Sequence, residues 1–150
     1  MRAARAAVEI KVASAEDAEL LRRCFAAFAV LRPHLTEAAF VDGVRRQARE
    51  GYRLSYIESD GAVVAAAGYR TAHFLAWGHV LYVDDLTTAP QARRRGYGGA
   101  LLDWLIDEGR RLGCDELHLD SGYQRHDAHR LYLNRGLQLA SHHFSLKLRR

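Results

Sequence analysis

Three arginines and three glycines stand within seven consecutive residues, in the segment Arg93-Arg94-Arg95-Gly96-Tyr97-Gly98-Gly99-Ala100. Glycine lets the backbone turn so that several N–H groups face one point. A helix that starts here adds a partial positive charge, and the guanidinium groups add whole charges. Residues 93–100, which we call the Arg/Gly loop, therefore have the chemistry of a phosphate-binding site.

Two common phosphate-binding motifs fit the Arg/Gly loop badly. A Walker loop ends in Gly-Lys-Ser/Thr, whereas Gly99 is followed by Ala100 and Leu101. A dinucleotide fingerprint has a third glycine where Leu101 stands, and it usually lies in the first strand-to-helix turn of its domain. A solvated, charged turn at the start of a helix remains an alternative explanation for the arginines.

The elements on either side of this loop are predicted from hydrophobic periodicity. The apolar run His79–Thr88 indicates a strand. Residues 98–112 have an apolar helical face and charges on the remaining faces, and Gly113 ends this helix. The loop is thus expected to connect a strand to the N-terminus of a helix.

The rest of the chain is expected to alternate between strands and helices in the same way. Strands are predicted at 8–12, 52–59, 62–71 and 116–120. Helices are predicted from the capping-box-like start Ser14-x-x-Asp17 to before Pro33, from Thr36 to before Gly51, and at 127–135. Asp60-Gly61 predicts a tight hairpin turn, residues 73–78 a loop, and residues 137–148 one bent strand or two short ones. This order predicts an α+β fold, a three-layer α/β/α sandwich with a mixed sheet.

Length and composition favour one globular domain over residues 1–150. The chain has 49% hydrophobic and 27% charged residues, and no apolar run approaches the ~20 residues that span a membrane. Residues 1–7 are basic without a long apolar stretch behind them, which predicts a disordered tail rather than a signal peptide. Cys24 and Cys114 are interpreted as small buried hydrophobic residues rather than as partners in a disulfide. We therefore expect a cytoplasmic protein.

The net charge of +4 raises the question of nucleic-acid binding. Nearly all the positive charge is arginine spread over every helix, with no aromatic and basic repeat, so neither a nucleic-acid nor a membrane partner is expected. The eight histidines include His126 and His129, but no metal-ligand motif is present, so no metal site is expected.

The segment Arg93–Gly98 matches the pattern Gln/Arg-x-x-Gly-x-Gly/Ala, and by it the chain resembles the GNAT superfamily of N-acetyltransferases. Residues 128–137 are similar to the helix-and-turn signature of that family. The resemblance covers residues 8–148 and is strongest over 80–137. The stretch 125–133 also resembles a subgroup that includes the aminoalkylphosphonate acetyltransferases.

The resemblance implies a site for acetyl-CoA as co-substrate and a fold whose fourth and fifth strands splay apart. The Leu86 N–H would polarise the thioester carbonyl, and the backbone of Leu86 and Thr88 would pair with the pantetheine arm. The implied cofactor-binding residues are Leu86, Thr87, Thr88, Arg93, Arg94, Arg95, Gly96, Tyr97, Gly98, Gly99 and Ala100.

The resemblance also implies a general acid, Tyr132, which would protonate the departing thiolate. Many relatives carry a glutamate at the position of Tyr82. Asp84 lies two residues further on, on the same strand face by alternation, and is the candidate general base. Asp85 is expected on the opposite face, paired with an arginine. A water chain or an already neutral amine remains open as an alternative to Asp84.

The implied activity is the transfer of an acetyl group to a primary amine of a small molecule, by direct attack in a ternary complex. Because no carboxylate stands at Tyr82, a non-catalytic acyl-CoA-binding module remains an alternative, as does a protein N-terminal or lysine acetyltransferase. Residues 28–40 and 73–79 are expected to select the acceptor, whose identity is open. A homodimer is a further open alternative.

Overall fold

The structure is a computed structural model that describes residues 7–149 and separates into two compact units, which meet between His118 and Leu119. The tail expected at residues 1–7 lies, apart from Ala7, outside the described residues. A single domain over the whole chain stays a prediction. No helix among the described residues is long and apolar enough to cross a membrane.

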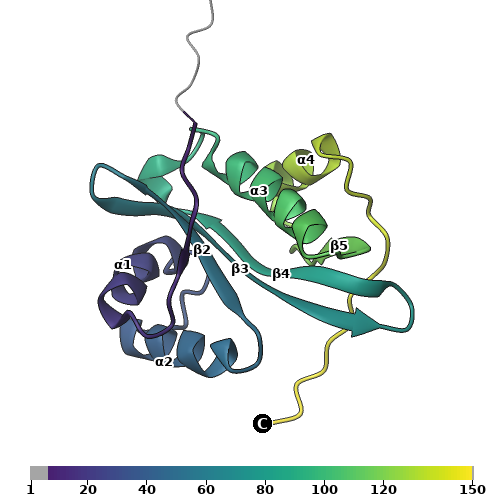
Figure 1. The fold of residues 1–150 in the computed structure, drawn as a ribbon, viewed down its shortest axis with the longest axis horizontal. Helices are drawn as coiled ribbons and strands as arrows, with labels where there is room; N and C mark the ends of the chain where they lie inside the picture. The colour runs from purple at the N-terminus through teal and green to yellow at the C-terminus, as the bar shows by residue number, and fades with distance from the viewer. Residues whose placement is uncertain (1–6, 150) are drawn as a thin grey trace, which may run out of the picture. The chain divides into compact units, whose positions relative to one another are not determined.

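The first unit is built on a sheet with the strand order β1-β2-β3-β4-β5 (Figure 1). Its elements along the chain are β1 (Lys11–Ala13), α1 (Ala18–Phe28), α2 (Glu37–Ala48), β2 (Arg53–Ser59), β3 (Ala62–Phe74), β4 (Gly78–Thr88), the short 3-10 helix η1 (Pro90–Ala92), α3 (Tyr97–Arg111) and β5 (Glu116–Leu119), the last of which reaches the boundary between the units.

The sheet is mixed, as predicted. Each of the pairs β1–β2, β2–β3 and β3–β4 is antiparallel. The beginning of β5 lies beside the beginning of β4, because the Asp115 N–H donates to the His79 carbonyl (2.7 Å) and the His79 N–H donates to the Asp115 carboxylate (2.8 Å). Two neighbouring strands that begin at the same edge run in the same direction. The predicted splay between β4 and β5 stays a prediction.

The helix α2 begins after Thr36 as the sequence predicts, whereas α1 begins after Asp17 and not after Ser14, the first residue of the predicted capping box. The Asp17 carboxylate accepts from the Leu20 N–H (3.0 Å) at the start of α1, and the Thr36 hydroxyl accepts from the Ala39 N–H (3.2 Å) at the start of α2. Each side chain satisfies a backbone donor that has no partner within the helix.

The first unit has the predicted three layers, with α1 and α2 on one face of the sheet and α3 on the other (Figure 1). Leu54 and Tyr56 of β2 belong to the core that α1 and α2 build with the sheet. Tyr69 of β3 points to the other face, where its ring packs edge-on against Trp104 of α3 at 5.7 Å. Alternation along the strands thus supplies apolar side chains to both helix layers.

Two predicted boundaries in the first unit are wrong. The strand predicted at 8–12 is β1, which starts at Lys11 because only residues 11–13 pair with β2. The loop predicted at 73–78 is shorter, since Phe74 pairs with Gly78 and His73 with His79. The two histidine rings stack at 4.3 Å, so aromatic side chains that looked like loop residues extend the hairpin.

The second unit contains α4 (His126–Asn134), which ends before Gly136, a residue with φ +87°. The predicted strands at 137–148 are wrong, because residues 137–149 contain no strand. Phe144, Leu146 and Leu148 alternate as in a strand, yet each is more than four-fifths exposed. Alternation stabilises a strand only where a sheet buries one of its faces.

Candidate active site

The Arg/Gly loop runs from the end of η1 into the first turn of α3, and two of its residues have a left-handed backbone. Gly96 has φ +83° at the N-cap of α3, and Arg94 has φ +63°. A positive φ suits glycine but costs roughly 1–2 kcal/mol in a residue with a side chain. Backbone strain of this kind is most common at functional sites, so the left-handed Arg94 indicates that the conformation of this turn is important for function.

Positive charge at the loop is not neutralised within the described part of the chain. Arg93, Arg94 and Arg95 are exposed, and none of them forms an ion pair or hydrogen bond with another described side chain. The first turn of α3 has no acidic residue, and no side chain caps its N-terminus. The N–H groups at the start of α3 and three guanidinium groups therefore stay available to an anion.

A β-bulge in β4 changes the predicted direction of Asp85, whereas Asp84 lines the same cavity as Tyr82, as predicted. Val83 pairs with Tyr69 and Asp85 with Gly68, so Asp84 is an extra residue on β4 without a partner on β3. An extra residue shifts the alternation by one position. Asp84 and Asp85 consequently line the same cavity, on the α1/α2 face of the sheet, and the prediction that Asp85 lies on the opposite face is wrong.

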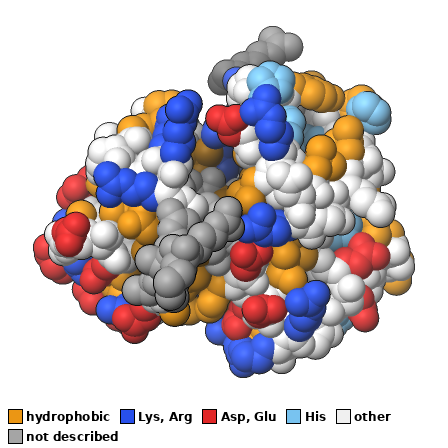
Figure 2. Space-filling view, turned by 90° about the horizontal axis from the view of Figure 1, so that it is seen from above, with side chains coloured by type: hydrophobic (Ala, Val, Ile, Leu, Met, Phe, Trp, Pro, Cys, Tyr) orange, Lys and Arg blue, Asp and Glu red, His pale blue; other side chains and the backbone are white. Residues whose placement is uncertain are grey.

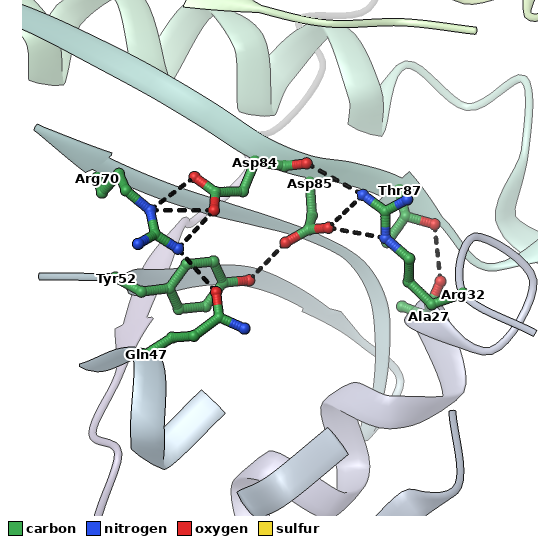
Figure 3. A network of polar contacts seen from close by, with 8 residues as sticks. All are labelled: Ala27, Arg32, Gln47, Tyr52, Arg70, Asp84, Asp85 and Thr87. Carbon is green, nitrogen blue, oxygen red and sulfur yellow. Dashed lines mark hydrogen bonds and ion pairs between the residues drawn. The ribbon is translucent and has the colours of Figure 1, made fainter. Parts of the chain in front are cut away.

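Asp84 is held by Arg70 of the neighbouring strand (Figure 3). Arg70 Nε donates to both carboxylate oxygens (3.1 and 3.0 Å), and Nη2 donates to Oδ2 (2.6 Å). Nη2 also donates to Gln47 Oε1 of α2 at 2.7 Å. Burial raises the pKa of Asp84 above its ordinary value, although Arg70 opposes this shift.

Asp85 joins three elements through hydrogen bonds. It accepts from Arg32 Nε (3.1 Å) and Nη2 (2.8 Å) and from the Tyr52 hydroxyl (2.8 Å). Arg32 Nη2 also donates to the Asp84 carbonyl at 3.2 Å, so the α1–α2 connection is tied to the bulge itself (Figure 3). The expected pairing of Asp85 with an arginine is confirmed. Burial, with Asp85 nearby, raises the pKa of Tyr52 well above its ordinary value.

The site predicted from the sequence does not include Arg32, Tyr52 or Arg70, which belong to this network. Arg70 carries a usable signal, because an arginine next to an apolar strand run calls for a carboxylate partner. Arg32 carries none, since it lies 53 residues from Asp85 and in no regular element.

Five residues of this network, Arg32, Gln47, Tyr52, Asp84 and Asp85, line a cavity of about 520 Å³, which we call the α1/α2 pocket. It lies between β4 and the helices α1 and α2, and much of its lining comes from residues 28–40, one of the two segments expected to select the acceptor. The lining residues are Phe28, Arg32, His34, Leu35, Ala39, Phe40, Gly43, Val44, Gln47, Tyr52, Tyr82, Asp84 and Asp85.

The next three residues of β4 continue the pairing with β3, in which Leu86, Thr87 and Thr88 oppose Ala67, Ala66 and Ala65. The buried Thr87 hydroxyl donates to the Ala27 carbonyl of α1 at 2.7 Å. The Thr87 side chain therefore fastens α1 to the sheet, which leaves only its backbone for the predicted contact with a cofactor.

Tyr132 lies on α4 in the second unit. Its hydroxyl has no hydrogen-bond partner among the described residues. Burial raises its pKa, and the charge of Arg125 opposes the shift. The phenol thus stays protonated at neutral pH, as a general acid must.

The described residues show no group of three or more His, Cys, Asp or Glu side chains that could bind a metal ion. Basic and acidic side chains are interspersed on the face that Figure 2 shows. Cys24 and Cys114 are both free as predicted, and Cys24 is buried, whereas Cys114 is only partly buried.

Comparisons with known proteins place the chain in a family. The family model described as "Acetyltransferase (GNAT) family" matches residues 18–137. The chain is 35% identical over 97 residues to an uncharacterized N-acetyltransferase, YhdJ, of Bacillus subtilis, a match that covers 64% of this chain and 68% of YhdJ.

Solved structures share the fold. An acetyltransferase of Trypanosoma brucei has a TM-score of 0.76 at 22% identity, covering 94% of this chain and 99% of the other. A predicted acetyltransferase from Clostridium acetobutylicum, solved with acetyl-CoA, has a TM-score of 0.71 at 16% identity, covering 94% and 96%. With the family model matching most of its length, the chain belongs to the acetyltransferase (GNAT) family and is an acyltransferase.

Proposed function

We propose that this protein transfers the acetyl group of acetyl-CoA to a primary amine of a small molecule by direct attack in a ternary complex. The amine nitrogen bonds to the thioester carbonyl carbon, the carbon–sulfur bond breaks, and coenzyme A leaves as a thiolate. Two protons leave the attacking ammonium nitrogen on the way to the amide: one is removed by a base before attack and passes to solvent, and the loss of the second is balanced by the proton that the thiolate receives.

The observation that carries this proposal is the unneutralised positive charge of the Arg/Gly loop. Three exposed arginines, a left-handed Arg94 and an uncapped α3 N-terminus fit the pyrophosphate of coenzyme A. Family membership supports the same ligand, because this family uses acetyl-CoA.

The acceptor amine is assigned to the α1/α2 pocket. A strand rises about 3.3 Å per residue, so Asp84 and Asp85 stand within roughly 7 Å, along β4, of the Leu86 N–H that would polarise the thioester carbonyl. An ammonium group at the two carboxylates is thereby close to an acetyl group at Leu86. The pocket thus has both the position and the charge for an acceptor.

Asp84 and Tyr132 are assigned the two proton transfers. The raised pKa of Asp84 is closer to the pKa of an effective general base than the pKa of an ordinary aspartate is. Arg70 supplies three hydrogen bonds to the carboxylate, which leaves one of its four lone-pair positions for the substrate or for a water. Tyr132 is assigned the transfer of a proton to the thiolate.

A second function, a non-catalytic acyl-CoA-binding module, is favoured by one observation. Asp84, the candidate base, is already paired with Arg70, and the neighbouring Tyr82 supplies no carboxylate. Such a module binds the cofactor without turning it over, so binding and turnover must be measured separately.

Isothermal titration with acetyl-CoA tests the part of the proposal that both functions share. We expect saturable binding that weakens as salt is added, because the loop contacts are ionic. Absence of binding at millimolar acetyl-CoA contradicts the assignment of the Arg/Gly loop.

A further inference from the structure

Arg70 and Asp84 form an ion pair on the pocket face of the sheet. Arg70 of β3 lies opposite Tyr82 of β4, which lines the α1/α2 pocket, and residues directly opposite each other share a face. The Arg70 side chain is 25% exposed and that of Asp84 is 20% exposed, so water screens this pair less than a pair at the surface. The guanidinium group therefore acts on the carboxylate more strongly than an exposed arginine would.

The direction of the Asp84 carboxylate depends on Arg70. Asp84 is the extra residue of the bulge, so no partner residue on β3 fixes its position. Arg70 Nε and Nη2 occupy two lone-pair positions of Asp84 Oδ2, and Nε occupies one of Oδ1. A carboxylate has about four such positions. Among the described residues, the position that stays free thus belongs to Oδ1.

The guanidinium group of Arg70 is itself held by two further residues (Figure 3). Nη2 donates to Gln47 Oε1 of α2 at 2.7 Å. The guanidinium carbon lies 5.5 Å from the centre of the Tyr52 ring, within the range of a cation–π contact. Because the planar guanidinium group is fixed in this way, the carboxylate that it binds is held in one orientation.

Arg70 is also the charge that most opposes the protonation of Asp84. Burial raises the pKa of Asp84, Arg70 lowers it through hydrogen bonds and charge, and weaker effects come from Asp85, which raises it, and Arg32, which lowers it. Without Arg70, the carboxylate would bind a proton at a higher pH. The other ionisable groups near this ion pair are Glu50, which lies 3.9 Å from Arg70 Nη1, and the pocket residues His34, Tyr52 and Tyr82.

From this geometry we propose that Arg70 is a positioning residue for acetyl transfer. It holds Asp84 so that the free lone pair of Oδ1 receives the first proton of the acceptor ammonium group, and it keeps the carboxylate ionised until then. Arg70 does not itself line the α1/α2 pocket, so it acts through Asp84. The inference rests on the proposed function, in which Asp84 is the general base.

The pH dependence of kcat in two Arg70 variants tests both parts of this role. The assay follows thiol release with saturating acetyl-CoA and the most active of four amines, namely phenethylamine, phenylalanine, 2-aminoethylphosphonate and spermidine. Arg70→Gln removes the charge, so we expect the acidic limb to move to higher pH and kcat on that limb to fall about tenfold or more. Arg70→Lys keeps the charge but lacks the planar fork. Its limb should stay near the wild-type position while its plateau falls about tenfold.

Arg23→Gln is the matched control, because Arg23 binds Glu58 at 2.6 Å and neither residue lines the pocket. This variant should keep the wild-type limb and plateau. The amine is the same throughout, so its own titration does not move the limb of one variant relative to another. An arginine with a merely structural role would change stability without moving the limb. An unmoved limb in folded Arg70→Gln therefore overturns the inference.

Asp84→Asn separates failure of the inference from failure of the proposed function. If Asp84→Asn keeps the wild-type limb, or if none of the four amines accelerates thiol release, the proposed function fails and the inference with it. If Asp84→Asn loses the limb while Arg70→Gln leaves it in place, the inference alone is overturned. Melting curves show which variants are folded. If Arg70→Gln is not, Arg70→Lys decides, because a plateau equal to that of the wild type overturns the inference.

Discussion

The Tyr52 phenol packs directly against the backbone of Gly68 on β3. A Cβ at position 68 would overlap the hydroxyl and ring atoms of Tyr52. Because glycine leaves this space, Tyr52 reaches across β3 and donates its hydroxyl proton to Asp85 (2.8 Å). A residue without a side chain thus allows the hydrogen bond that orders the carboxylate beside the bulge.

We predict that Gly68→Ala destabilises the protein and weakens the pocket. The new methyl group forces Tyr52 to move, which costs about 1–3 kcal/mol through overpacking. Gly43→Ala is the matched control, since its methyl group meets open space and alanine favours a helix by roughly 1 kcal/mol. Urea unfolding should show opposite shifts in the free energy of unfolding. Equal shifts in the free energy of unfolding would mean that the position of Tyr52 does not depend on a glycine at position 68.

Carboxylates placed in the Arg/Gly loop are predicted to abolish cofactor binding. Gly98→Asp and Gly96→Glu each put a negative charge beside the expected pyrophosphate, and the second also imposes a positive φ on a residue with a side chain. Gly61→Asp introduces the same charge at a positive-φ glycine in the β2–β3 hairpin and serves as the control. Calorimetry with coenzyme A makes the measurement. Unchanged affinity in both loop variants removes the loop from the site.

The parts of the site that could be predicted from the sequence are those determined by residues close together in the chain. The Arg/Gly loop, the Thr36 cap and the Asp60-Gly61 hairpin turn were predictable because a few adjacent residues determine them.

The bulge at Asp84 was not predictable, because alternation carries no sign of an extra residue and the pairing partner lies on another strand. The missing strands at 137–148 have a related cause. Their apolar alternation is real, but a strand also needs a neighbour, and no local pattern supplies one.

We predict that Asp84→Asn removes the acidic limb of the pH–rate profile. A base acts only when ionised, so wild-type kcat should rise with pH through the raised pKa of Asp84, and the variant should be about 10²–10⁴-fold slower without that rise. The exposed Asp42→Asn on α2 is the control. A wild-type profile in Asp84→Asn would assign the proton transfer to a water chain instead.

The raised pKa of Asp84 also has a consequence for stability. The folded protein binds this proton more tightly than the unfolded chain does. The protonated Asp84 therefore stabilises the folded protein fully at a pH below the pKa that Asp84 has in the unfolded chain. This stabilisation is lost as the pH rises through the pKa that Asp84 has in the folded protein. Urea unfolding at several pH values should show a decline in this window that Asp84→Asn lacks.

For Tyr132→Phe we expect a loss of rate without a loss of binding. The ring packing is kept and the proton donor removed, so the Kd for acetyl-CoA should stay constant while kcat falls by about two to four orders of magnitude. A purely structural tyrosine predicts the reverse, unchanged turnover with at most ~1 kcal/mol of stability lost. Turnover and melting temperature measured on one preparation separate the two roles.

The central claim, acetyl transfer to an amine, is tested most directly by the initial rate of thiol release from acetyl-CoA with and without a primary amine. The account predicts a rate that rises with amine concentration, saturates, and falls in Asp84→Asn and Tyr132→Phe, with one acetylated amine formed per thiol released. A rate equal to the background hydrolysis of acetyl-CoA across every class of amine, in a protein that binds acetyl-CoA, would contradict it and leave a non-catalytic binding module.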